Sequence, residues 1–177
     1  MAAEEGFTIW FTGWSGAGKT TIAIALEEEL KKRGIRYVQR LDGDIVREGL
    51  CSDLGFSKDD RNENIKRASF VAELLSKNGV ATLVSFISPY RLLREHAREN
   101  CHNFIEVYVK CDKETLIERD VKGLYKQAIE GKIPEFTGIS DPYEEPLNPE
   151  IILNTADQTL SESVNTVIEF LEKNGYI

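Results

Sequence analysis

Eight consecutive residues have the types and spacing that bind a phosphate chain. They follow the pattern G-x-x-x-x-G-K-[ST] and are Gly13, Trp14, Ser15, Gly16, Ala17, Gly18, Lys19 and Thr20. The glycines let backbone N–H groups close around phosphate oxygens, the Lys19 ammonium adds a positive charge at the β- and γ-phosphates, and the Thr20 hydroxyl can ligate Mg²⁺. The pattern therefore predicts a site for a nucleoside triphosphate with magnesium.

The residues on either side of this loop support the prediction. Phe7–Thr12 is aromatic and β-branched, as in a buried strand, and Thr20–Lys32 carries apolar residues at helical spacing. The loop then lies between a strand and a helix, and the helix N-terminus points at the phosphates. A chance glycine-rich turn, the alternative interpretation, does not require this order.

A second group of polar residues follows the next predicted strand. Asp42, Gly43 and Asp44 come at the carboxyl end of that strand, where open parallel sheets bind ligands. The glycine allows a sharp turn that aims both carboxylates into the site, although aspartate and glycine are also common in ordinary turns. Arg47 follows Asp44 by three residues, so it can contact an anion near the same carboxylates.

In the helix predicted over Lys58–Lys77, the face that points to the core is apolar along most of its length but polar near the N-terminus. Its apolar stripe consists of Ile65, Ala68, Ala72 and Leu75. Helical spacing extends that line back to Asn64 and Arg61, which need polar partners because burying them unpaired is costly. An anion and a nucleobase would suit them, and a capping or salt-bridge role is the alternative. Phe56, just before this helix, is either a hydrophobic staple or a platform for a base.

A third candidate lies where the third predicted strand ends. Ile87 precedes Ser88 and Pro89, which together form a helix start signal. Exposed N–H groups at a helix start are able to hold a phosphate or a sulfate. The sequence therefore predicts a further anion-binding position here.

Five strand patterns alternate with five helical patterns. The strands are predicted at Phe7–Thr12, Arg36–Leu41, Val80–Phe86, Phe104–Lys110 and Glu150–Asn154. The helices are predicted at Thr20–Lys32, Lys58–Lys77, Pro89–Glu99, Lys113–Arg119 and Leu160–Lys173. This alternation predicts a three-layer α/β/α fold with a five-stranded parallel sheet covered on both faces. No linker, repeat or low-complexity tract interrupts it, so we expect one domain over residues 1–177.

One segment, residues 120–149, breaks the alternation. Glycines and prolines recur along it, together with Tyr125, Phe136 and Tyr143. A loop this long in a compact domain is usually functional or disordered, and the aromatic residues argue against disorder. We therefore expect a lid that closes over substrate and excludes water; a passive surface excursion is the alternative.

Composition narrows the functional classes. The net charge of −8 argues against broad nucleic-acid binding, and no run of about 18 apolar residues is present that would span a membrane. The acidic residues 1–5 do not resemble a signal peptide, and three cysteines without metal-ligand spacing fit a reduced cytosol. We expect a cytoplasmic protein that gathers a few cations and N–H groups in one site for its anionic ligands.

Further segments form a set that is more specific than the phosphate-binding loop. They are Leu41–Arg47, Leu54–Ser57, Asp60–Ile65, Ile87–Arg91, Arg119–Tyr125, Phe136–Ile139 and Pro142–Glu144. With these segments in this order over nearly the whole chain, the sequence resembles the adenylylsulfate kinases (APS kinases), a family of P-loop kinases. Trp14, where that family usually has leucine, is a small departure at a position that contributes backbone.

The resemblance implies phosphorylation of the 3′-hydroxyl of adenosine 5′-phosphosulfate (APS) by MgATP, which gives PAPS and ADP. It implies catalytic roles for Asp44, Lys19 and Lys122. It implies nucleotide contacts from the loop with Thr21 and Arg119, and Mg²⁺ held by Thr20 and, through water, by Asp42. The APS contacts that it implies are Asp42, Asp44, Arg47, Phe56, Arg61, Asn64, Ile87, Ser88, Lys122, Gly123, Leu124, Phe136 and Thr137, with the two phenylalanines on either side of the adenine. A homodimer is typical of the family, and a functional link to ATP sulfurylase is left open.

Other functions remain as alternatives. A kinase of the same fold acting on a nucleoside monophosphate or a sugar acid is the nearest; Phe56, Phe136 and Asn64 favour a nucleotide acceptor but do not separate APS from AMP. A switch that binds ATP or GTP without an acceptor is a second alternative. The chain has no N-K-x-D motif for guanine, which argues against a GTPase, and a switch has little use for the lid and the Asp-Gly-Asp motif. An inactive paralogue is the third, and the intact Lys19, Asp44 and Arg61 argue against it.

Overall fold

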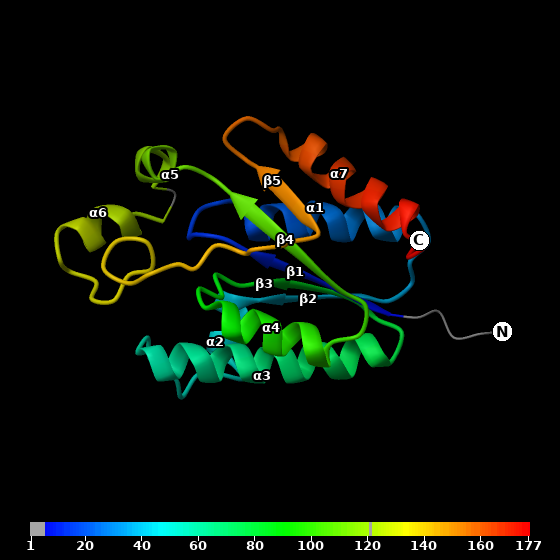
Figure 1. The fold of residues 1–177 in the computed structure, drawn as a ribbon, viewed down its shortest axis with the longest axis horizontal. Coiled ribbons are helices and arrows are strands. Elements are labelled where there is room, and N and C mark those ends of the chain that lie inside the picture. Colours follow the sequence, from blue (N-terminus) through cyan, green and yellow to red (C-terminus); the bar gives the residue numbers. More distant parts are fainter. Residues whose placement is uncertain (1–5, 121) are drawn as a thin grey trace.

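The computed structural model describes residues 6–120 and 122–177 and shows a parallel sheet between two layers of helices (Figure 1). The strands are β1 (Phe7–Thr12), β2 (Val38–Asp42), β3 (Ala81–Ser85), β4 (Phe104–Lys110) and β5 (Ile151–Asn154). Neighbouring strands are parallel, in the order β2-β3-β1-β4-β5. The predicted three-layer α/β fold with a five-stranded parallel sheet is confirmed.

Helices cover both faces of the sheet. They are α1 (Lys19–Lys32), α2 (Gly43–Glu48), α3 (Lys58–Lys77), α4 (Arg91–Asn100), α5 (Lys113–Arg119), α6 (Leu124–Ile129) and α7 (Leu160–Lys173). In Figure 1, α1 and α7 lie on one side of the sheet and α3 and α4 on the other, while α5 and α6 lie beyond the carboxyl ends of the strands. Within the described ranges, no helix combines the length and the apolar character needed to cross a bilayer.

Each face of the sheet has its own apolar core, because successive side chains of a strand point to opposite faces. Ile9 and Phe11 of β1 are buried in one cluster with apolar residues of α1 and α7. Trp10, between them, is buried in the other cluster with Ile65 and Ala68 of α3. The central strand is therefore fixed from both sides, and the phosphate-binding loop starts from a rigid strand end.

The predicted start of the third helix is wrong. The helix begins at Arg91 rather than Pro89, and Tyr90 is the extended residue that precedes it. Ser88 has a φ of 42°, in the left-handed region, so the chain turns at Ser88 and enters the helix only two residues later. Five of the other predicted elements have the bounds that the structure shows, and the rest differ by one or two residues; for example, the second strand ends at Asp42 rather than Leu41.

Two short helices were not predicted. Helix α2 follows β2 directly and begins at Gly43, so the Asp-Gly-Asp turn is the start of a helix. Helix α6 lies inside residues 120–149, so this segment is not a loop throughout. Each helix is six residues long, which is too short for an apolar period to be recognised in the sequence.

Candidate active site

The phosphate-binding loop joins β1 to the N-terminus of α1, as its pattern predicts. Gly13 has a φ of 146°, and a Cβ placed there would lie 2.3 Å from the Val109 carbonyl oxygen, so only glycine fits. Gly18, in the left-handed conformation, is the residue from which α1 starts. Among the residues that the structure describes, no side chain caps this helix end. Its N–H groups are therefore directed toward the position that a phosphate would take.

Lys19 is the buried cation of the loop. Its Nζ donates hydrogen bonds to the carbonyl oxygens of Gly13 at 2.9 Å and Trp14 at 2.7 Å. Burial, and after it the nearby charge of Lys122, lowers the pKa of the Lys19 ammonium to about 7, although Asp42 and Asp44 act in the opposite direction. The structure thus brings together four charged residues from three separate segments of the sequence.

The two aspartates after β2 have different surroundings. Asp42 is buried and caps α2, since its Oδ1 accepts from the Asp44 N–H at 3.0 Å. Its Oδ2 accepts from the Thr20 hydroxyl at 2.6 Å. A hydroxyl and a carboxylate beside the loop are the hard oxygen ligands that Mg²⁺ prefers, so these residues fit the predicted metal. Asp44 is exposed instead, and the Lys122 Nζ lies 2.5 Å from its Oδ2.

Residues 120–149 contact the phosphate-binding loop. The Tyr125 hydroxyl on α6 donates to the Ser15 carbonyl oxygen at 2.8 Å. Gly138 packs so closely on the Trp14 indole that a Cβ there would lie 3.3 Å from the ring. Gly123, also left-handed, starts α6 directly after Lys122. The segment that we expected to be a lid is thereby placed over the loop and beside Asp44.

The candidate acceptor residues gather around the start of α3. The Arg47 guanidinium lies over the Phe56 ring, 4.4 Å from its centroid, and donates to the Gly55 carbonyl oxygen at 2.8 Å. The Phe56 side chain is 65% exposed, so it is available as a platform rather than packed as a staple. Asn64 is buried, and its Oδ1 has no hydrogen-bond partner among the described residues. A buried acceptor of this kind fits a ligand that carries an N–H donor.

Arg61 connects α3 to the segment 120–149. Its Nη1 donates to the Thr137 Oγ1 at 2.8 Å and to the Asp141 Oδ2 at 2.7 Å. Phe136, next to Thr137, packs edge-to-face on Tyr125 with ring centroids 5.1 Å apart. The structure therefore brings the Phe56 side and the Phe136 side of the predicted base site together through one arginine.

The anion-binding position predicted at Ile87 and Ser88 differs from our expectation, because its polar groups already have partners within the chain. Ser88 is buried, and its Oγ accepts from the Trp10 indole N–H at 3.0 Å. The Arg91 N–H at the helix start is not free for an anion, because it donates to the Glu144 Oε2 at 2.7 Å. The prediction of exposed N–H groups is therefore wrong at Arg91, while Ile87 remains partly exposed beside the site.

The remaining predicted nucleotide contacts lie at the other end of the loop. Arg119 is exposed, and its Nη2 donates to the Thr155 carbonyl oxygen at 3.2 Å. The Thr155 hydroxyl in turn donates to the Ala17 carbonyl oxygen at 2.8 Å. Thr21 is exposed in the first turn of α1. Leu124, a predicted APS contact, is the first residue of α6. Arg119 thus reaches the loop through one intermediate residue.

Three residues had no predicted role, although each forms a hydrogen bond with a residue of this site. They are Tyr90, Tyr125 and Asp141. Tyr125 was visible only as one of the aromatic residues of the segment 120–149. Asp141 follows the Phe-Thr-Gly-Ile motif closely, and no spacing rule links it to an arginine eighty positions earlier.

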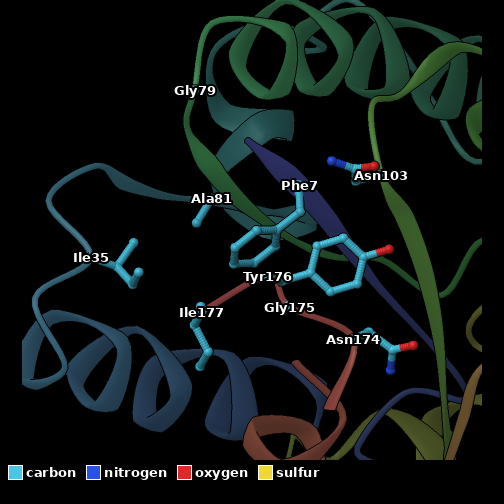
Figure 2. A pocket seen from close by; sticks show the side chains of 9 residues that line it. All are labelled: Phe7, Ile35, Gly79, Ala81, Asn103, Asn174, Gly175, Tyr176 and Ile177. Atoms are coloured by element: carbon cyan, nitrogen blue, oxygen red, sulfur yellow. The ribbon is translucent and has the colours of Figure 1, made fainter. Parts of the chain in front are cut away.

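A hollow of about 690 Å³ lies at the opposite, amino end of the sheet (Figure 2). It is lined by Phe7, Ile35, Gly79, Ala81, Asn103, Asn174, Gly175, Tyr176 and Ile177. The rings of Phe7 and Tyr176 lie next to each other in its lining, tilted by 54° with centroids 5.8 Å apart. No acidic or basic side chain is among these described lining residues, so the hollow lacks the groups that phosphate chemistry requires.

The chain is similar to known proteins over most of its length. The family model for adenylylsulphate kinase matches residues 5–154. A probable adenylyl-sulfate kinase of Pseudomonas aeruginosa is 63% identical over 95% of this chain and 78% of that protein. An adenylyl-sulfate kinase of Halothermothrix orenii is 59% identical over 100% of this chain and 95% of that protein. The solved structure of the Mycobacterium tuberculosis APS kinase CysC in complex with AMPPNP and APS has a TM-score of 0.90 and 43% identity, covering 95% of this chain and 98% of that chain. The chain therefore belongs to the adenylylsulfate kinase family.

Proposed function

We propose that this protein transfers the γ-phosphate of MgATP to the 3′-hydroxyl of APS, giving PAPS and ADP, in sulfate activation. The main observation behind the proposal is that the phosphate-binding loop and the residues proposed to hold the acceptor lie together at the carboxyl end of the sheet. Thr20 of the phosphate-binding loop donates to Asp42 at 2.6 Å. Asp44, two residues after Asp42, pairs with Lys122 at 2.5 Å on the acceptor side. A donor phosphate on the loop would then lie next to a carboxylate that can receive a proton.

On the donor side, the loop amides and Lys19 would hold the β- and γ-phosphates, with Thr21 and Arg119 contacting the rest of the nucleotide. Thr20 and Asp42 would hold Mg²⁺, which supplies charge neutralisation on the phosphates when bound. Phosphoryl transfer depends mainly on positioning and electrostatic stabilisation, and this chain provides both with groups fixed between β1 and α1.

On the acceptor side, Asp44 would accept the proton of the 3′-hydroxyl as the new bond forms. Lys122, which pairs with Asp44 in this structure, would turn to the transferring phosphoryl group and offset its charge. The contacts proposed for APS are Asp42, Arg47, Phe56, Arg61, Asn64, Ile87, Ser88, Gly123, Leu124, Phe136 and Thr137. The buried, unpartnered Asn64 Oδ1 supports a ligand with an amino group in this position.

The choice of acceptor is tested by ADP release with a panel of candidates. We expect turnover with APS and at most background release with AMP, CMP or gluconate at the same concentration. ADP release that is fastest with gluconate or with a nucleoside monophosphate would replace APS as the substrate. Release that is independent of every acceptor would instead indicate a simple ATPase or a switch.

The buried position of Lys19 predicts that MgATP binding takes up a proton. The pKa of Lys19 is about 7 in the ligand-free protein, and the phosphate charges would raise it in the complex. At pH 8 about nine-tenths of Lys19 is neutral before binding, so binding would take up about 0.9 proton. The apparent Kd for MgATP would accordingly rise with pH above about 7, by up to about tenfold per pH unit.

This uptake is measured by calorimetric titration with MgATP at pH 8 in two buffers of different ionisation enthalpy. The observed enthalpies should differ by the buffer difference multiplied by the number of protons taken up. Equal enthalpies in the two buffers, after correction for the protonation of ATP itself, would contradict the assignment of the lowered pKa to Lys19.

Further properties belong to this proposal. The protein would be a homodimer, as is typical of the family, and a single kinase domain over residues 1–177 whose lid is formed by about residues 120–149. It would act in the cytoplasm. Its substrate carries a sulfate joined to AMP, so an enzyme that adenylylates sulfate, an ATP sulfurylase, would have to supply it.

A further inference from the structure

We propose that Asp141 is a positioning residue for the acceptor nucleotide: it holds Arg61 in place, and Arg61 in turn sets the spacing between the Phe56 and Phe136 sides of the base site. The identity of the acceptor in this inference rests on the function proposed above. The contacts that carry it are present in the structure independently of that function.

Most N–H groups of Arg61 donate hydrogen bonds to other residues of the chain. A guanidinium has five N–H donors, and the structure gives four bonds from this one. Its Nε donates to the Phe56 carbonyl oxygen at 2.8 Å, its Nη1 to Thr137 Oγ1 at 2.8 Å and Asp141 Oδ2 at 2.7 Å, and its Nη2 to the Glu135 carbonyl oxygen. Among the described residues this leaves one N–H without a partner, so the main task of Arg61 here is to join these segments.

The joined segments are those that carry the two aromatic rings. The Phe56 carbonyl belongs to the first ring's own residue, while Glu135 and Thr137 flank Phe136 on both sides. A displacement of the Arg61 guanidinium would therefore change the separation of the two rings. Stacking between two rings requires that separation to match the thickness of a base.

Asp141 is the only carboxylate among the four described acceptors of Arg61. The side chains of Arg61 and Asp141 are 11% and 21% exposed, so their ion pair is better sheltered from water than an ordinary surface pair. The Tyr90 hydroxyl donates to the same Oδ2 at 3.0 Å and fixes it from the α4 side. The Asp141 backbone closes the turn that contains Phe136, donating to the Phe136 carbonyl oxygen at 3.1 Å.

The test compares Asp141→Asn with the wild type by steady-state kinetics. We expect the KM for APS to rise about 10- to 100-fold, as for loss of a hydrogen bond to a charged group. The KM for MgATP and the kcat at saturating APS should stay within about twofold. Asp141→Glu, which keeps the carboxylate, should recover part of the loss. Tyr90→Phe, which removes one hydroxyl, should raise the KM for APS by a smaller factor.

The matched control is Asp53→Asn. Asp53 also pairs with an arginine of α3, at 2.6 Å from Arg67, but this pair lies away from residues 120–149. The control should leave all three kinetic constants unchanged. An unchanged or lower KM for APS in Asp141→Asn would overturn the proposal, since a lower value would mean that Asp141 only withholds Arg61 from the substrate.

A measurement without substrate separates this inference from the proposed function. Amide hydrogen exchange of the ligand-free proteins should show faster exchange over residues 135–141 in Asp141→Asn than in the wild type and in Asp53→Asn. Equal exchange in all three proteins would overturn the positioning role, whatever the acceptor is. Absence of APS-dependent turnover in the wild type would overturn the proposed function and leave the exchange result to decide the role of Asp141.

Discussion

Replacing Asp44 with asparagine should lower kcat about 10²- to 10⁴-fold, the range over which a positioned proton acceptor contributes to catalysis. A ribose hydroxyl does not ionise at neutral pH, so a group must receive its proton as the phosphoryl group arrives. Asp44 is exposed at the carboxyl end of β2, and its Oδ2 lies 2.5 Å from the Lys122 ammonium. The amide of asparagine keeps the size of the side chain but cannot act as this base.

Binding should survive the Asp44→Asn substitution, because Asp44 caps no helix and its side chain is exposed. Equilibrium titration should give Kd values for MgATP and APS within a few-fold of the wild type, and Asp53→Asn should leave kcat unchanged. Turnover of Asp44→Asn at the wild-type rate would remove Asp44 from the reaction. A parallel loss of MgATP affinity would instead assign it to the metal.

Replacing Lys19 with alanine should reduce both MgATP affinity and kcat. The ammonium is the one buried cation of the phosphate-binding loop, and a preorganised charge of this kind contributes about 10²- to 10³-fold to a rate when it faces developing negative charge. Its two partners are carbonyl oxygens of the loop itself, so a bound phosphate would compete with them for the same Nζ. The effect should therefore appear in binding and in turnover together.

The measurement for Lys19→Ala combines steady-state kinetics with thermal unfolding at increasing MgATP. The wild-type Tm should rise with MgATP concentration, while the Tm of Lys19→Ala should respond only at much higher concentrations. Lys173→Ala, an exposed lysine on α7, is the control and should behave like the wild type. Unchanged kinetics in Lys19→Ala would mean that the loop does not bind the reacting phosphates.

The fold could be predicted because its signals are local. Apolar strands alternate with helices at short range, and the phosphate-binding loop carries its own conformational requirement in Gly13 and Gly18. The donor side of the site follows from that loop, since Lys19 and Thr20 are part of the same motif. Asp42 and Asp44 were predicted from their position at a strand end, where a parallel sheet directs its ligands.

The acceptor side could be predicted only in part, because its contacts join distant residues. The start of α4 was misplaced since Ser88 and Pro89 have the composition of a helix start, whereas a bond from Trp10 helps to hold Ser88 in a turn. Arg61 was expected to meet an anion of the substrate, but four of its N–H groups already have partners within the chain. Sequence spacing contains no information on a contact that spans eighty residues.

The central claim, that a phosphate on the loop is transferred to a ribose hydroxyl beside Asp44, is tested most directly by identifying the product. The protein would be incubated with MgATP and APS, and the new nucleotide analysed by mass spectrometry and ³¹P NMR. We predict one added phosphate per APS, attached to the 3′-oxygen, with one ADP released for each. A phosphate at another position, or ADP with only inorganic phosphate beside it, would contradict the account.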